Sequence, residues 1–184
     1  MKSLIIFCIL ISAHTFAQWQ PDHRLTNNPG YSFTSYNNAW CIASGGNDVH
    51  VVWVDQRDGN GGEIYYKRST DEGTTWEADV RLTINPAISF APSVAISGQS
   101  VHVVWYDTRN FNEEVYYKRS TNGGATWEPD SRLTVDPSSG CYLPSITVSG
   151  SNVHVAWEND GAINPEIYHM RSTNGGTNWG PVTR

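Results

Sequence analysis

A unit of about 52 residues is repeated along the chain, and this repetition constrains the fold more than any other feature. The segment Val-His-Val-Val-Trp begins at Val49 and again at Val101, and the variant Val-His-Val-Ala-Trp begins at Val153. A second segment, rich in tyrosine, follows each of them in register and starts at Glu63, Glu114 or Glu166. Self-similarity at a fixed period indicates an array of equivalent structural units, each too small to bury its own apolar surface.

Each unit is predicted to contain four short strands. In the second unit we expect them at 92–97, 101–106, 114–121 and 127–134, with Gly98 in the first turn. The strand at 101–106 is apolar on both faces, so it should lie between two layers. Tandem immunoglobulin-like sandwiches would need about 100 residues for each unit. The period therefore favours an all-β fold, a β-propeller of four-stranded antiparallel blades.

The repeat divides the chain into about three blades and one extra strand. The expected boundaries are an outer strand of the closing blade with its linker at 18–36, and blades at 37–84, 85–136 and 137–184. Closed propellers have roughly four to eight blades. We therefore expect part of a six-bladed type of propeller that continues in a longer chain or self-associates to close.

The N-terminus has the pattern of a signal peptide at 1–17. Lys2 precedes an apolar run at 4–11, and Thr15 and Ala17 place small residues before a cleavage site. The run is too short for a membrane span, which needs about 20 apolar residues. The protein is thus expected to be secreted, extracytoplasmic or on the cell surface. The net charge of −6, without a basic stripe, argues against nucleic acid as a partner.

The two cysteines that follow the signal peptide do not occupy equivalent places in the repeat. Cys41 aligns with Ser93 and Ser145, whereas Cys141 aligns with Ser89. A disulfide needs Cα atoms within about 7 Å of each other. Both side chains are therefore expected to be buried and not joined to each other.

A motif between the third and fourth strands of each unit resembles the Asp-box, Ser-x-Asp-x-Gly-x-Thr-Trp. The copies start at Ser69, Ser120 and Ser172, and two of them have Asn in place of Asp. On these motifs the chain resembles the sialidase-like Asp-box (BNR repeat) β-propellers, across residues 18–184. Asp and Asn accept hydrogen bonds from nearby backbone N–H groups, and glycine supplies positive φ, so the box is expected to be structural. Its residues are Ser69, Asp71, Gly73, Thr75, Trp76, Ser120, Asn122, Gly124, Thr126, Trp127, Ser172, Asn174, Gly176 and Trp179.

Resemblance to sialidases implies a tyrosine nucleophile with a carboxylate partner, an aspartic acid/base and three arginines that bind the sugar carboxylate. The stretch that matches the first arginine motif, 37–42, contains no arginine. Every arginine of the chain occupies a repeat position. Residues repeated by blade symmetry point outward in different directions, which argues against a complete catalytic site within these residues.

The remaining catalytic candidates are Arg57 and Asp58, in the loop after the second strand, where sialidases carry an arginine and the acid/base aspartate. The second unit repeats this loop around Arg109. The simpler interpretation is a salt bridge in each hairpin, Arg57 with Glu63 and Arg109 with Glu114. The third unit has no arginine after the second strand, so the pairing is expected to lapse at Glu166.

Three aromatic residues that depart from the repeat are candidates for ligand binding: Trp40, Phe90 and Tyr142. They lie at or before first strands, which line the channel of a propeller, so they could stack on a sugar, although packing is the simpler role. The histidines at 50, 102 and 154 are symmetry equivalents and cannot meet around one metal ion. The loop with Asp55, Asp58, Asn60 and Glu63 offers oxygen ligands for a structural calcium ion, although its spacing is not diagnostic.

These observations favour an exported propeller that acts as a binding or scaffold module for glycans or cell-surface proteins, without a complete catalytic site in these residues. The alternative is the N-terminal part of an exo-sialidase-like glycoside hydrolase whose remaining catalytic residues lie beyond residue 184. A surface-anchored adhesin is a third possibility. The sequence leaves open whether the protein is an enzyme.

Overall fold

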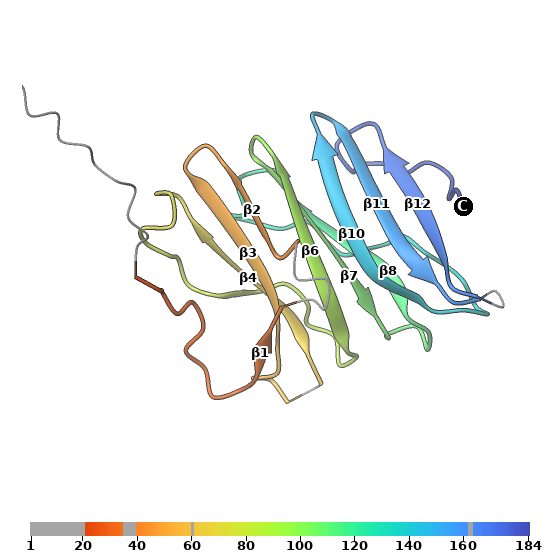
Figure 1. Ribbon diagram of the computed structural model, residues 1–184, viewed down its shortest axis with the longest axis horizontal. Helices are drawn as coiled ribbons and strands as arrows, with labels where there is room; N and C mark the ends of the chain where they lie inside the picture. Colours follow the sequence, from red (N-terminus) through yellow and green to blue (C-terminus); the bar gives the residue numbers. More distant parts are fainter. Residues whose placement is uncertain (1–20, 35–39, 60, 162–163) are drawn as a thin grey trace, which may run out of the picture.

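The computed structural model describes residues 21–34, 40–59, 61–161 and 164–184, which form three antiparallel β-sheets without a helix. The predicted signal peptide and Asn60 lie outside these residues. Figure 1 shows the three sheets side by side in the order of the sequence. Within the described residues, no helix is long and apolar enough to cross a membrane. The expectation of an all-β fold of antiparallel sheets is confirmed, and the second sheet has the expected four strands.

In each sheet successive strands pair with each other, except that β1 and β2 both pair with β3. The second sheet has the order β6-β7-β8-β9 and the third β10-β11-β12, while in the first β3 pairs with β1, β2 and β4, and β4 pairs with β5. The bounds are β1 Ser32–Phe33, β2 Ile42–Gly45, β3 Asp48–Asp55, β4 Glu63–Ser69, β5 Val80–Arg81, β6 Ser89–Ser97, β7 Ser100–Asp107, β8 Glu114–Ser120, β9 Ser131–Arg132, β10 Cys141–Ser149, β11 Asn152–Asn159 and β12 Glu166–Ser172.

The core lies between the sheets, because the central strands are apolar on both faces. Val103 and Trp105 of β7 pack in one cluster with residues of the first sheet, and Val104 packs in the other with residues of the third sheet. Successive side chains of a strand point to opposite faces, so one strand contributes to both clusters. The predicted burial of the second strand on both faces is confirmed. Cys41 and Cys141 are buried in different clusters.

The first strand of the first sheet differs from its expected form because it is divided. Ser32 pairs with Asp55 in β3, as Ser89 pairs with Asp107 in the second sheet. β2 then pairs further along β3, beginning with Ile42 opposite Val51. The first sheet therefore begins at Ser32, before the boundary at residue 37 that the repeat suggested. In β6 and β10 the same point is a short irregularity of register.

The fourth strands are shorter than predicted. Only two residues each are paired in β5 and β9, and in the third sheet a single bridge joins His169 to Thr183. A further backbone hydrogen bond from Leu82 N–H to the carbonyl of Ile64 (2.8 Å) continues the contact beyond β5. Residues 21–26, predicted as part of an extra outer strand, form no strand, but the Leu25 carbonyl accepts a hydrogen bond from Lys67 (2.8 Å). The Leu82 carbonyl receives the same contact from Lys118 (2.7 Å).

Candidate functional site

The connections of the three sheets gather at two opposite ends (Figure 1). At one end lie the tight hairpins before β3, β7 and β11, together with the repeated turns at 69–76, 120–127 and 172–179. The other end, which we call the loop face, carries the described connections at 27–31, 56–59 with 61–62, 84–88, 108–113 and 135–140. Loops at one end of a rigid scaffold are where binding and catalytic residues usually lie. The loop face is therefore the candidate functional region.

A buried aspartate organises the loop face in the first two sheets. Asp55 accepts hydrogen bonds from the Arg57 guanidinium (2.7 Å), the Trp53 indole (2.9 Å) and the Ser32 hydroxyl (3.0 Å). Burial alone would raise the pKa of Asp55, but the hydrogen bonds from Arg57, Trp53 and Ser32 outweigh burial and hold this pKa below its ordinary value. Asp107 has the equivalent partners in the second sheet. These carboxylates are thus ionised structural groups that fix the loops.

The expected hairpin salt bridges are wrong in their partners. Arg57 pairs with Asp55 (2.7 Å) and Asp79 (2.8 Å), and Arg109 pairs likewise with Asp107 and Asp130. Glu63 and Glu114 instead bind Arg81 (2.7 Å) and Arg132 (2.6 Å).

Strand register explains this exchange of partners. Tyr65 of β4 lies opposite Arg81 of β5, so Glu63, two residues before Tyr65 on the same face, is the diagonal neighbour of Arg81. The third unit has no arginine after its second strand, and Glu166 binds Arg184 (2.6 Å), the equivalent of Arg81 and Arg132. The glutamate therefore keeps an arginine partner in all three units, but this partner is never the loop arginine.

The catalytic candidate Asp58 is held by two partners. It accepts a hydrogen bond from the Tyr65 hydroxyl (2.6 Å) and forms an ion pair with Arg81 (3.1 Å). Burial and then the contact with Asp58 raise the pKa of Tyr65 to about 12, which opposes formation of a nucleophilic phenolate. The second sheet repeats the contact between Tyr116 and the uncharged Asn110. This repetition favours a structural role for the Tyr65–Asp58 pair.

The third unit replaces most of this polar network. Asn159 stands where Asp55 and Asp107 stand in the other sheets, and it donates to Asp136 (3.2 Å). In the second sheet the two residue types are exchanged: the amide is on the loop residue, Asn85, which donates to Asp107 at the end of β7 (3.3 Å). Each pair therefore keeps one carboxylate and one amide, which preserves the hydrogen bond without placing two buried negative charges together.

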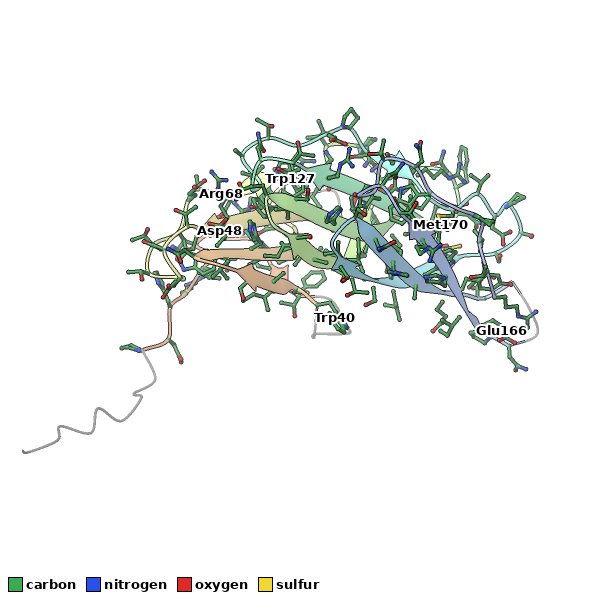
Figure 2. The ribbon with its side chains drawn as sticks, turned by 90° about the horizontal axis from the view of Figure 1, so that it is seen from above. Trp40, Asp48, Arg68, Trp127, Glu166 and Met170 are labelled. Atoms are coloured by element: carbon green, nitrogen blue, oxygen red, sulfur yellow. The ribbon has the colours of Figure 1, made fainter. Side chains whose placement is uncertain are left out.

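Of the three aromatic candidates, Trp40 is the most exposed. Its side chain is 47% exposed, and Figure 2 shows it on the opposite side of the molecule from Trp127. Phe90 and Tyr142 are half-buried in an aromatic row between the sheets, both against Tyr106 (ring centroids 6.1 and 5.6 Å apart). Packing thus accounts for Phe90 and Tyr142, whereas Trp40 is about half exposed to solvent.

The loop face also exposes apolar side chains that sequence reasoning did not select. Tyr31 is 80% exposed and Phe111 is fully exposed, and Ile84 and Val135 accompany them. An alignment of the two loops would have singled out Phe111, because Phe111 takes the place that Gly59 has in the first unit.

The repeated turns hold themselves together by the expected hydrogen bonds. The Ser69 hydroxyl accepts from Gly73 N–H (2.9 Å), and Asp71 accepts from the backbone and hydroxyl of Thr75 (2.8 and 2.6 Å). Asn122 and Asn174 accept the same backbone hydrogen bond in the other turns (2.9 Å each). The Asp-to-Asn departures therefore preserve the turn, since only an acceptor oxygen is needed.

The tryptophans of the second and third turns pack against the preceding sheet. The ring of Trp127 meets that of Tyr66 edge-on (centroids 4.9 Å apart), and Trp179 meets Tyr117 in the same way (5.0 Å). Arg68 of the first sheet also donates a hydrogen bond to the Gly123 carbonyl in the turn of the second sheet (2.7 Å). Since these contacts cross between sheets, the turns stabilise the stacking of one sheet on the next.

Replacing Trp127 by alanine is expected to lower the free energy of unfolding by about 3 kcal/mol, because an inter-sheet aromatic contact is lost. Trp76 is the matched control. It has the same position in the turn of the first sheet, and no sheet precedes the first one in the described residues. Urea unfolding followed by circular dichroism would measure both variants. Equal losses would contradict the assignment of Trp127 to the interface.

The histidines have structural partners within their own sheets. His50 bonds Tyr66 and His102 bonds Tyr117 (2.7 Å each), and both histidines are buried. His154 contacts His169, which replaces the tyrosine (3.1 Å). In the part of the chain that the structure describes, no group of three or more His, Cys, Asp or Glu residues is placed to hold a metal ion. Asn60, one of the candidate calcium ligands, lies outside that part.

No family model and no curated protein matches the chain, whereas solved structures do. A Hadza microbial sialidase matches with 16% identity and a TM-score of 0.57 over 83% of this chain and 36% of its own. A Trypanosoma rangeli sialidase has 13% identity and a TM-score of 0.55, over 85% and 34%. The GH93 α-L-arabinofuranosidase of Fusarium graminearum has 16% identity and a TM-score of 0.53, over 80% and 46%.

The chain thus spans a third to a half of the length of these solved structures. Its three antiparallel sheets have the fold of part of these β-propeller glycoside hydrolases.

Proposed function

We propose that the protein is an exported β-propeller module of the Asp-box type that binds glycans, or proteins of the cell surface, through its loops and exposed aromatic side chains. The proposal rests on the fold, which is the fold of part of carbohydrate-processing propellers, and on the exposure of Trp40. Further blades, from a longer chain or from a second copy, would complete the ring.

The main support for a binding module over a sialidase is that most of its arginines are already in ion pairs. A sialidase clamp needs three guanidinium groups free to converge on one carboxylate. In the described residues, most arginines already pair with an acidic side chain of their own sheet: Arg57, Arg68, Arg81, Arg109, Arg119, Arg132 and Arg184. Freeing one of the partly buried pairs would leave a carboxylate without its partner, which is costly. These arginines therefore suit a scaffold better than an anion clamp.

The test is a comparison of binding with turnover. We expect the protein to bind members of a glycan array and to leave a fluorogenic sialoside intact. Trp40→Ala is expected to weaken glycan binding about tenfold if this side chain is the platform. Turnover of the sialoside that is lost in Asp58→Ala would instead support the alternative, in which the chain is the N-terminal part of a sialidase-like hydrolase. Absence of any glycan binding would refute glycans as the ligand and leave a protein of the cell surface.

A further inference from the structure

Phe111 occupies a backbone position that is unfavourable for its residue type. It closes the turn at 108–111, with a hydrogen bond from Phe111 N–H to the carbonyl of Thr108 (3.2 Å), at a φ of 72°. The equivalent turn of the first unit is closed by Gly59 at a φ of 75°. A bulky residue at positive φ is strained, and such strain persists mostly at functional sites.

Burial does not compensate for this strain, because the Phe111 side chain is fully exposed. Neither the backbone nor the core of the described residues is stabilised by a phenyl ring at this position. An exposed and strained aromatic residue therefore points to a ligand that covers the ring.

A second departure from the first unit lies beside Phe111. In the first unit, Asp58 binds Nη1 of Arg81 (3.1 Å). The second unit has Asn110 there, so Nη1 of Arg132 has no acidic partner among the described residues, while its Nη2 binds Glu114 (2.6 Å). The exchange of a carboxylate for an amide thus removes an ionic partner from this guanidinium group.

These groups line one hollow of the loop face, with a volume of about 460 Å³. Phe111, Val135 and Pro137 supply apolar surface, and Asn110, Arg132 and Asp136 supply polar groups. An aromatic ring beside a few hydrogen-bonding groups matches a sugar, which has an apolar ring face and hydroxyls at its edge.

The charges of the hollow select against acidic sugars. Arg132 is neutralised by Glu114, and hydrogen bonds from Ser139 and from Ser138 N–H lower the pKa of Asp136 to about 2. Asp136 is therefore ionised at neutral pH and leaves the hollow negative, on a chain whose net charge is −6. A carboxylate-bearing sugar would be repelled there.

We propose that this hollow of the second unit is a binding site for a neutral saccharide, which stacks on Phe111 and receives a hydrogen bond from Arg132. The inference rests on the proposed glycan binding, but it adds a site separate from Trp40 and specifies the charge of the ligand.

The test uses an array of neutral and sialylated oligosaccharides, followed by calorimetry with the neutral member bound best. Phe111→Gly is expected to weaken this binding at least about tenfold. Its melting temperature should be no lower than that of the wild type, because glycine suits the positive φ. Asn110→Asp should also weaken binding, because the new carboxylate would pair with Arg132 as Asp58 pairs with Arg81 and would add negative charge to the hollow. Tyr31→Gly, which removes another exposed aromatic side chain of the loop face, is the control and should bind normally.

The outcomes separate the two proposals. Unchanged binding by Phe111→Gly, or a wild type that binds only sialylated members, would overturn the neutral-saccharide site and leave glycan binding standing. A wild type that binds no glycan would overturn both.

Discussion

Replacing Gly124 by alanine is expected to destabilise the protein by about 3 kcal/mol or more, a large part of a domain's usual 5–15 kcal/mol. A Cβ atom at this position would lie 1.9 Å from the Tyr66 hydroxyl oxygen, and the φ of 85° strains any side chain. Tyr66 is buried in the core between the first two sheets, so it cannot move aside without disturbing them. Equilibrium unfolding in urea, followed by tryptophan fluorescence, measures the effect.

Gly98→Ala separates steric overlap from backbone strain. Gly98 also has a positive φ, 56°, but nothing lies within 4 Å of its would-be Cβ. We expect this control to cost about 1 kcal/mol, from strain alone. If both variants were equally stable, the close approach of the turn to Tyr66 would be refuted.

Replacing Asp107 by alanine is expected to cost about 3–5 kcal/mol. The change removes one of the two ion pairs of Arg109 (2.7 Å each) and the acceptor of the Trp105 indole and the Ser89 hydroxyl. Because these groups are buried or half-buried, water cannot fully replace the lost partner. Glu128→Ala is the control. Its side chain is 45% exposed and pairs with Arg119, so at most about 1 kcal/mol should be lost.

The same carboxylate makes stability depend on pH. Burial opposes ionisation of Asp107, but hydrogen bonds from Arg109 hold its pKa below the ordinary value of 3.8. A depressed pKa in the folded state contributes stability that is complete above the unfolded pKa and is lost as the pH falls through the folded pKa. The wild type should therefore lose stability below about pH 4, and Asp107→Ala should lose less. Parallel pH profiles would contradict this account.

Much of the fold follows from the sequence because the repeat and the strand period act locally. The alternation of Val103, Val104 and Trp105 places these side chains on two faces, whatever lies beyond them. The turn glycines are likewise predictable, since a positive φ is a property of the backbone itself. Both expectations needed only the period of the chain and the chemistry of single residues.

The candidate site was less predictable because its contacts join separate strands. Proximity in sequence suggested Glu63 as the partner of Arg57, but the register of β4 against β5 directs Glu63 to Arg81. The division of the first strand before Ile42 was also hidden, since a repeat alignment does not show where a strand is interrupted.

The sequence by itself determined the all-β repeat, the two-sided burial of its central strands and the chemistry of its turns, because each depends on spacing along one chain. Only the tertiary structure decided that Trp127 packs on Tyr66 of the preceding sheet and that Arg57 pairs with Asp55 and Asp79. It also decided that the Phe111 side chain is exposed to solvent. Those outcomes depend on distances between strands and sheets, which register and packing fix and which no local pattern contains.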